Sequence, residues 1–208
     1  MTKSTEFIKV KINEDFIKAG EEAKNLHQKE HVGGYSKFDS PNDAFIWGIG
    51  EAIVENILVE NNLSHPKDYI KNKDLDVKYD PWDFQIVTQN ISLEVKTQNY
   101  NYGSIAEYWE VAVAAQQIDK KGDYYIFIFV DVNFTEAIIV GFIDKEKYKK
   151  NSRFIDQGEE FRPGYKATNP MHRLSIDKLK NFNDFIKEVA KWAKILSQEI
   201  KTGYVKIF

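Results

Sequence analysis

The chain has 208 residues and no cysteine, which excludes disulfide bonds, zinc ribbons, thiol catalysis and iron–sulfur clusters. Its four histidines, His27, His31, His65 and His172, are scattered and form no HExxH motif. No apolar run reaches about 18 residues, and the first residues, MTKSTEFIKVKINEDF, lack the apolar core of a signal peptide. We therefore expect a cytoplasmic protein without a membrane partner. Any metal would be held by carboxylates, which favours a hard cation such as Mg²⁺.

The charge of the chain says less about its function than these absences do. The net charge of −3 does not by itself indicate a nucleic-acid-binding protein, and no GxxxxGK[ST] motif indicates a nucleotide cofactor. Residues 145–180, however, contain ten Lys/Arg and five Asp/Glu, together with several aromatic residues. Such a basic region is suited to contact phosphates, and the alternative interpretation is a solvated loop in a lysine-rich protein.

The sequence is apolar enough for a folded domain, with 42% hydrophobic and 14% aromatic residues. Alternation predicts a strand over 7–12, and helical periodicity predicts an amphipathic helix over 14–30. A second helix, predicted over 42–61, is apolar on nearly every side and should be buried. It contains Gly48 and Gly50, and each glycine in a helix interior costs about 1 kcal/mol relative to alanine. We therefore expect this helix to pack closely against another element.

The remaining elements predict a mixed α/β arrangement. Strands are expected over 74–79, 84–88, 91–97, 123–132 and 136–143, a third helix over 104–118 after a capping box at Ser104, and a last helix over 183–201. The order strand, helix, strand favours a parallel crossover, and hence a mixed sheet. We expect one domain over 1–208, with a core at about 42–143, an N-terminal helical extension over 1–41 and a C-terminal basic loop and helix over 144–208.

The segment YDPWDFQIVTQNISLEVKTQ, residues 79–98, alternates like a buried hairpin but carries charged residues. If Gln89-Asn90 is a two-residue turn, one side of the hairpin is apolar: Phe84, Ile86, Leu93 and Val95. The other side carries Asp83, Gln85, Glu94 and Lys96. Asp83 would then lie opposite Lys96, with Glu94 on the diagonal. A surface hairpin with an Asp–Lys pair is the structural alternative to a catalytic site.

Two carboxylates and a lysine in one place suit phosphodiester hydrolysis. Carboxylate oxygens bind Mg²⁺, which makes a water molecule more acidic and offsets the charge of the phosphate. A lysine beside the attacking water can orient it or stabilise the charge of the transition state.

These residues resemble the PD-(D/E)xK nuclease superfamily, whose core runs helix, three strands, helix, strand. The likeness covers about residues 42–132 and implies a restriction-endonuclease-like three-layer core with a central mixed β-sheet flanked by helices. The family's Asp corresponds to Asp83 in Pro81-Trp82-Asp83, where one residue separates the proline from the aspartate. Its (D/E)xK motif corresponds to Glu94-Val95-Lys96.

The resemblance also implies a role for each residue. Asp83 and Glu94 would bind the metal directly, together with the backbone carbonyl of Val95, while Glu51 would bind through water or a second ion. Mg²⁺ is the implied cofactor, with Mn²⁺ as a substitute.

Two further catalytic positions complete the implied site. Lys96 would position the nucleophile. Some members of the family carry a glutamine on or after the second core helix, and here Gln116 is preferred to Gln117.

The expected function is that of a Mg²⁺-dependent DNA endonuclease of restriction or phage type, acting as a homodimer because cutting both strands usually needs two sites. An exonuclease or recombination nuclease on the same core, or a non-catalytic DNA-binding module with a nuclease-like fold, are the alternatives. Candidate DNA contacts are Lys37, Arg153, Arg162, Lys166, His172 and Arg173.

Overall fold

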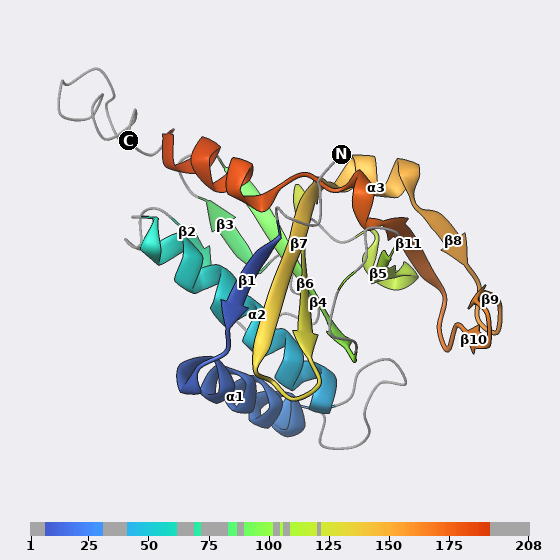
Figure 1. Cartoon of the computed structure of the whole chain (residues 1–208), viewed down its shortest axis with the longest axis horizontal. Helices are drawn as coiled ribbons and strands as arrows, with labels where there is room; N and C mark the ends of the chain where they lie inside the picture. The colour runs from blue at the N-terminus through green and yellow to red at the C-terminus, as the bar shows by residue number, and fades with distance from the viewer. Residues whose placement is uncertain are drawn as a thin grey trace.

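The computed structural model describes residues 7–30, 41–61, 69–71, 83–86, 90–101, 105, 109–119 and 122–191 (Figure 1). Its helices are α1 (Glu14–Glu30), α2 (Pro41–Glu60) and α3 (Lys145–Asn151), the 3₁₀ turns η3 (Ala115–Gln117) and η4 (Ile176–Lys178), and helical residues 182–191. Its strands are β1 (Ile8–Lys11), β2 (Tyr69–Lys71), β3 (Phe84–Ile86), β4 (Ile91–Tyr100), β5 (Glu110–Ala114), β6 (Tyr124–Asp131), β7 (Glu136–Asp144), β8 (Arg153–Ile155), β9 (Glu160–Arg162), β10 (Tyr165–Lys166) and β11 (Met171–Ser175). Within these ranges, no helix has the length and apolar character needed to cross a membrane.

Six strands form the central sheet, in the order β1–β7–β6–β4–β3–β2. β4 and β6 are parallel, whereas the other neighbouring strands are antiparallel. The fold is therefore α/β with a mixed sheet, as the sequence predicts. β1 belongs to the segment expected to be an N-terminal extension, but it pairs with β7 at the sheet edge and is part of the core architecture.

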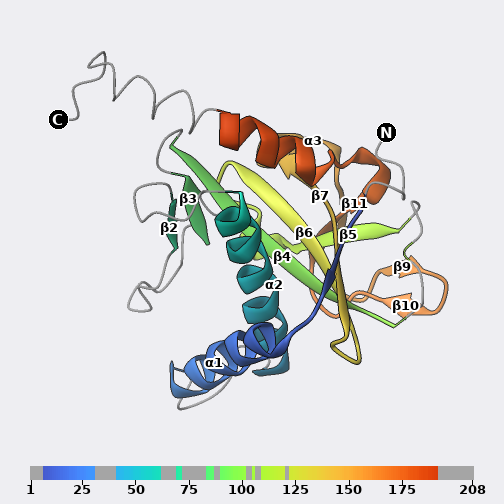
Figure 2. The ribbon, with the colours of Figure 1, turned by 60° about the vertical axis from the view of Figure 1, so that its left-hand side comes forward.

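Helices cover one face of the central sheet, and Figure 2 shows α2 lying along it. Apolar residues of α2 and of residues 182–191 pack there against β3, β4, β6 and β7. Two glycines permit the close approach of α2. A Cβ atom at Gly48 would lie 2.6 Å from the Cβ of Ala23 on α1, and a Cβ atom at Gly50 would overlap the hydroxyl of Thr97 on β4. The close packing expected from the glycines is confirmed.

A second sheet, the small sheet, covers the opposite face with strand order β5–β11–β8. The helix predicted over 104–118 is therefore wrong, because Glu110–Ala114 form β5 and only Ala115–Gln117 turn into a 3₁₀ helix. Val111 and Val113 are fully buried and alternate with half-buried residues, so tertiary burial follows the strand period of two. The central sheet is consequently covered by helices on one face and mainly by strands on the other.

The hairpin prediction is correct in its faces and wrong in its register. β3 pairs Phe84 with Leu93 and Ile86 with Ile91, which is two residues away from the predicted pairing. A shift of two leaves every side chain on its predicted face, whereas a shift of one would reverse them. The connection is longer than a two-residue turn and ends at Asn90, which has a φ of 51°. Asp83 consequently lies beside Glu94 rather than opposite Lys96.

The other predicted elements fall in three groups. The strand and helix expected at 7–12 and 14–30, and the strands at 123–132 and 136–143, are confirmed. The last helix is confirmed as far as residue 191. The strand predicted over 74–79 lies outside the described residues.

Candidate functional site

Asp83 is fixed at the start of β3 by two hydrogen bonds. Its backbone N–H donates to the carbonyl of Leu93 over 2.9 Å, and its Oδ2 accepts from the backbone N–H of Val95 over 2.6 Å. The Asp83 carboxylate therefore accepts the backbone hydrogen bond from β4 that a carbonyl of a longer β3 would otherwise accept. This bond holds the carboxylate against β4. The Val95 carbonyl remains a predicted metal ligand.

The electrostatics of Asp83 connect it with three other charged groups. Burial raises the pKa of Asp83 well above its usual value, and repulsion by Glu94 and Glu51 raises this pKa further. Attraction to Lys96 and the Val95 hydrogen bond act in the opposite direction but do not cancel the increase. The charges predicted to form one site, from β4 and α2, therefore all affect the ionisation of Asp83.

Glu94 and Lys96 form a buried ion pair on the face of β4 that lies under the small sheet. They are two residues apart on a strand, so both side chains project to the same side. Lys96 Nζ lies 2.7 Å from Glu94 Oε1, and the two side chains are only 13% and 5% exposed. Burial of a charge requires such a partner, because water no longer solvates it.

Gln117, and not the preferred Gln116, completes this group. Lys96 Nζ donates a second hydrogen bond to Gln117 Oε1 over 3.0 Å, whereas Gln116 is exposed. The preference for Gln116 assumed a helix, but the chain reaches this point as a strand followed by the 3₁₀ turn η3, which presents a different residue to β4.

Lys145 is a second cation near this site that the sequence analysis missed. It is the first residue of α3 and only 5% exposed, and its Nζ lies 5.5 Å from the ring centroid of Tyr125. Among the residues that the structure describes, Nζ has no hydrogen-bond partner. Burial lowers the pKa of Lys145, and attraction to Glu94 and repulsion from Lys96 also act on it. In the sequence it is one lysine in a basic stretch, and nothing local distinguishes it from Lys147 or Lys149.

The donor atoms at this site suit a divalent cation in their chemistry. Within the described part of the chain, no three His, Cys, Asp or Glu side chains are already grouped as a metal site. Asp83 and Glu94 are nevertheless neighbouring carboxylates, and the repulsion of Asp83 by Glu94 and Glu51 is of the kind that a bound cation relieves. Lys96 holds one oxygen of Glu94 in the present arrangement.

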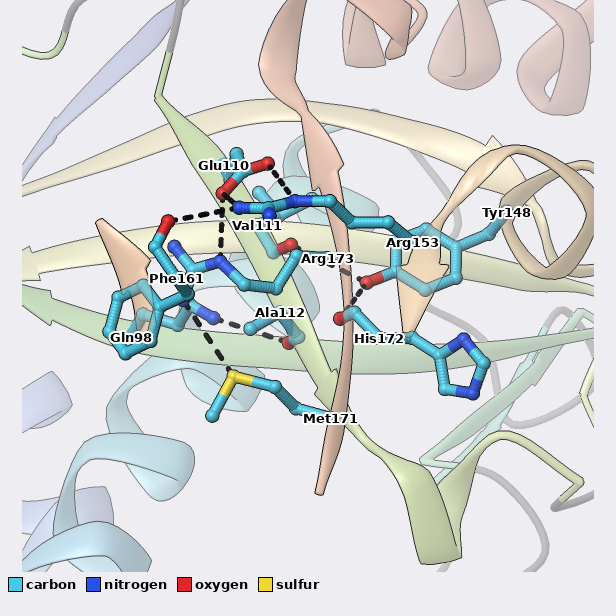
Figure 3. Close-up of polar contacts among 10 residues, drawn as sticks. All are labelled: Gln98, Glu110, Val111, Ala112, Tyr148, Arg153, Phe161, Met171, His172 and Arg173. Atoms are coloured by element: carbon cyan, nitrogen blue, oxygen red, sulfur yellow. Dashed lines mark hydrogen bonds and ion pairs between the residues drawn. The ribbon is translucent and has the colours of Figure 1, made fainter. Parts of the chain in front are cut away.

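Three of the predicted DNA contacts lie together. Arg153, Arg162 and Arg173 line a cavity between the two sheets and the β9–β10 hairpin, and Figure 3 shows Arg153 and Arg173 directed at the carboxylate of Glu110. Lys166 is exposed on β10 and does not line this cavity. Lys37 lies outside the described residues.

His172 does not join these arginines, because neighbouring residues of β11 point to opposite faces of the small sheet. Its Nδ1 lies 3.2 Å from Ser152 Oγ, and its ring packs edge-on against Phe154. Burial lowers the pKa of His172. The prediction of a DNA contact at His172 is not supported by this position.

The ion pair and the cavity lie on the same face of the central sheet. Glu94, Lys96 and Gln98 alternate along β4, and Gln98 already lines the cavity. No protein-family model matches this chain, and no curated protein matches it. The likeness to the PD-(D/E)xK nucleases is therefore carried by the residues of this site alone.

Proposed function

We propose that the protein is a Mg²⁺-dependent deoxyribonuclease that hydrolyses phosphodiester bonds on a restriction-endonuclease-like fold. The supporting observation is that Asp83 is hydrogen-bonded to the backbone of Val95, whose two neighbours on β4, Glu94 and Lys96, form an ion pair. Glu51 on α2 also acts on this site, since it raises the pKa of Asp83. A buried carboxylate with a raised pKa beside a lysine, as Asp83 is here, is typical of catalytic sites. The order α2, β3, β4 and then the parallel strand β6 is shared with the family's core, whereas β5 and η3 stand where that core has its second helix.

Each side chain has a role that follows from its position. When bound by Asp83 and Glu94, Mg²⁺ would supply charge neutralisation at the phosphate and make a water molecule more acidic. Lys96 is held between Glu94 and Gln117, so its ammonium group has a defined direction from which it orients the attacking water. Lys145 adds positive charge in a poorly hydrated setting, where it stabilises the negative charge that develops on the phosphate.

Cleavage of supercoiled and linear DNA in Mg²⁺ tests the proposal. Wild-type protein should cut, chelation should stop cutting, and Lys96→Ala and Asp83→Ala should be inactive while keeping a cooperative melt. Lys18→Ala is the matched control for Lys96→Ala, since it removes an exposed lysine on α1. Equal cleavage by wild type and Lys96→Ala would remove Lys96 from the mechanism. Discrete products would indicate an endonuclease, and digestion only from ends an exonuclease.

A non-catalytic DNA-binding module is the second candidate. It is favoured by the ion pair itself, in which Lys96 already satisfies one oxygen of Glu94 as a cation would. A protein that binds Mg²⁺ is stabilised by it according to the ratio of free metal to the dissociation constant. A thermal melt that is unchanged by millimolar Mg²⁺ and Mn²⁺, combined with DNA binding but no cleavage, would favour the module over the nuclease. Titration of the wild-type melt against each metal, with Asp83→Asn as control, makes the comparison.

A further inference from the structure

The cavity beside the proposed catalytic site has the size of a ligand-binding pocket. It has a volume of about 630 Å³, and small-molecule sites occupy roughly 300–1,000 Å³. We call it the arginine pocket, defined by Gln98, Trp109, Arg153, Arg162, Tyr165 and Arg173. Figures 1 and 2 show the β9–β10 hairpin, which supplies Arg162 and Tyr165, at the periphery of the molecule beyond the small sheet.

One carboxylate orders two of the three arginines. Arg153 donates to Glu110 through Nε over 3.1 Å and through Nη2 over 3.0 Å, and Arg173 Nε donates to the same carboxylate over 2.9 Å (Figure 3). Burial alone would raise the pKa of Glu110, but the hydrogen bonds from these arginines bring it below its usual value. Among the described residues that line the pocket, Glu110 is the one acidic residue, and Arg153, Arg162 and Arg173 are the basic residues. Positive charge is therefore in excess in the pocket. The pocket is therefore preorganised for an anion.

Flat faces are the second feature of the arginine pocket. The guanidinium of Arg162 lies 3.8 Å from the ring centroid of Tyr165, and that of Arg173 lies 4.2 Å from the ring of Phe161. Tyr165 is 48% exposed and lines the pocket together with Trp109. Planar bases stack on aromatic rings and on guanidinium planes, while phosphates accept hydrogen bonds from guanidinium groups.

Strand β4 sets the distance between this pocket and the catalytic site. A strand rises about 3.3 Å per residue, so Gln98 lies roughly 7 Å from Lys96 and roughly 13 Å from Glu94 along the same face. One strand of duplex DNA advances about 3.4 Å per nucleotide, and these distances correspond to roughly two to four nucleotides. A DNA strand that is cut at Lys96 and runs along β4 would therefore reach the pocket within a few nucleotides.

We propose that the arginine pocket binds one unstacked nucleotide of the DNA strand that enters the catalytic site. Its base lies against Tyr165 and Trp109, and its phosphate is bound by Arg162. The substrate class is DNA with a single-stranded or extrahelical nucleotide near the cleaved bond, because a base within a duplex stack has no face free to enter a pocket. This inference rests on the proposed nuclease function, because that function places the cleaved DNA strand along β4. Nucleotide binding by the pocket is nevertheless testable without cleavage.

The test measures binding of a labelled single-stranded oligonucleotide by fluorescence anisotropy in EDTA. Tyr165→Ala and Arg162→Gln should weaken binding, the former by roughly 5- to 150-fold if it supports one stacked base. The controls are Phe154→Ala, an exposed aromatic residue outside the pocket, and Lys18→Gln, an exposed cation on α1 that does not line it. All four positions are exposed, so melts should stay within a few degrees of wild type.

The outcomes separate the two proposals. Weaker binding in the two pocket variants and unchanged binding in the two controls supports the pocket, whether or not wild-type protein cuts DNA. Binding by Tyr165→Ala and Arg162→Gln that equals wild type overturns it, even if Lys96→Ala confirms the nuclease. Preference for fully paired duplex over the single strand also overturns it. Free nucleoside monophosphates should compete less strongly than the oligonucleotide does. If they bind with the same affinity per site, the assignment of the pocket to a DNA strand is overturned.

Discussion

Replacement of Lys96 by methionine gives a quantitative test of the buried ion pair. The change keeps most of the side-chain volume but leaves the carboxylate of Glu94, a residue only 4% exposed, without its nearest cation. Loss of one partner from a buried ion pair costs about 3–5 kcal/mol in the free energy of unfolding. Lys145 also attracts Glu94 and offsets part of the loss, so we expect a value near the lower limit.

The expected change in melting temperature follows from the size of the protein. For a domain of about 150–250 residues, each kcal/mol lowers the melting temperature by about 2–4 °C, so Lys96→Met should melt roughly 6–12 °C below wild type. Removal of both charges, in Glu94→Gln combined with Lys96→Met, should recover most of this loss because neither member of the ion pair is left charged without the other. Neither the single nor the double variant should cut DNA.

Thermal unfolding by circular dichroism at pH 7 in EDTA provides the measurement. Lys166→Met is the matched control and should change the free energy of unfolding by no more than about 0.5 kcal/mol, because its side chain is exposed. The double-mutant cycle gives the coupling energy directly. If Lys96→Met melts within 1–2 °C of wild type, or if the two single changes are additive, Glu94 and Lys96 do not form the pair on which the site depends.

Three further predictions address the site and its support. Asp83→Asn should raise the melting temperature without metal at pH 7. The raised pKa of Asp83 means that its ionised form destabilises the folded protein, and asparagine carries no such charge. Melts from pH 3 to 8 should show this gain disappearing below the unfolded pKa of about 3.9. Gly50→Ala should destabilise the fold by about 1–3 kcal/mol in urea unfolding, since its Cβ overlaps the Thr97 hydroxyl, and added Thr97→Ala should restore part of the loss. Tyr148→Phe should destabilise by about 1–3 kcal/mol in the same assay, because the hydroxyl of the fully buried Tyr148 donates to the carbonyl of His172 over 2.7 Å. A gain for Gly50→Ala, or no loss for Tyr148→Phe, would contradict the respective packing assignment.

Sequence periodicity identifies the middle strands of the central sheet, β4, β6 and β7, because they are long and have clear apolar patterns, whereas β2 has only three residues and was not predicted. β6 and β7 are buried almost throughout, and β4 alternates, so both patterns are visible without a structure. The hairpin register cannot be predicted in the same way, since two registers that differ by two residues place the same side chains on each face. The prediction of faces was therefore secure, while the partner of Asp83 depended on a turn whose length the sequence does not specify.

The segment at 104–118 shows a second limit. Ser104 and Glu107 satisfy a local capping signal, but the chain at Glu110–Ala114 is a strand because β11 pairs with it and the central sheet buries Val111 and Val113. The pairing joins residues about 60 positions apart, so no local pattern contains it. The same long-range contacts decide whether Gln116 or Gln117 reaches Lys96, and they bring Lys145 near the site. For that reason neither could be predicted from the sequence.

The polar face of β4 is the feature that connects the fold with a function. Glu94, Lys96 and Gln98 lie on a central strand beneath a second sheet, where apolar residues of similar volume generally give a stability equal to or greater than that of an ion pair. Each of them has a bonded polar partner: Glu94 and Lys96 bond each other, and Gln98 bonds the carbonyl of Ala112. This row of polar side chains on β4 ends at the arginine pocket. Burying its charges costs solvation free energy, which a core of apolar residues would avoid. Replacement of Glu94 and Lys96 by leucine and methionine should therefore leave the melting temperature equal to or above that of wild type while abolishing cleavage, and a lower melting temperature would assign these charges to the fold instead.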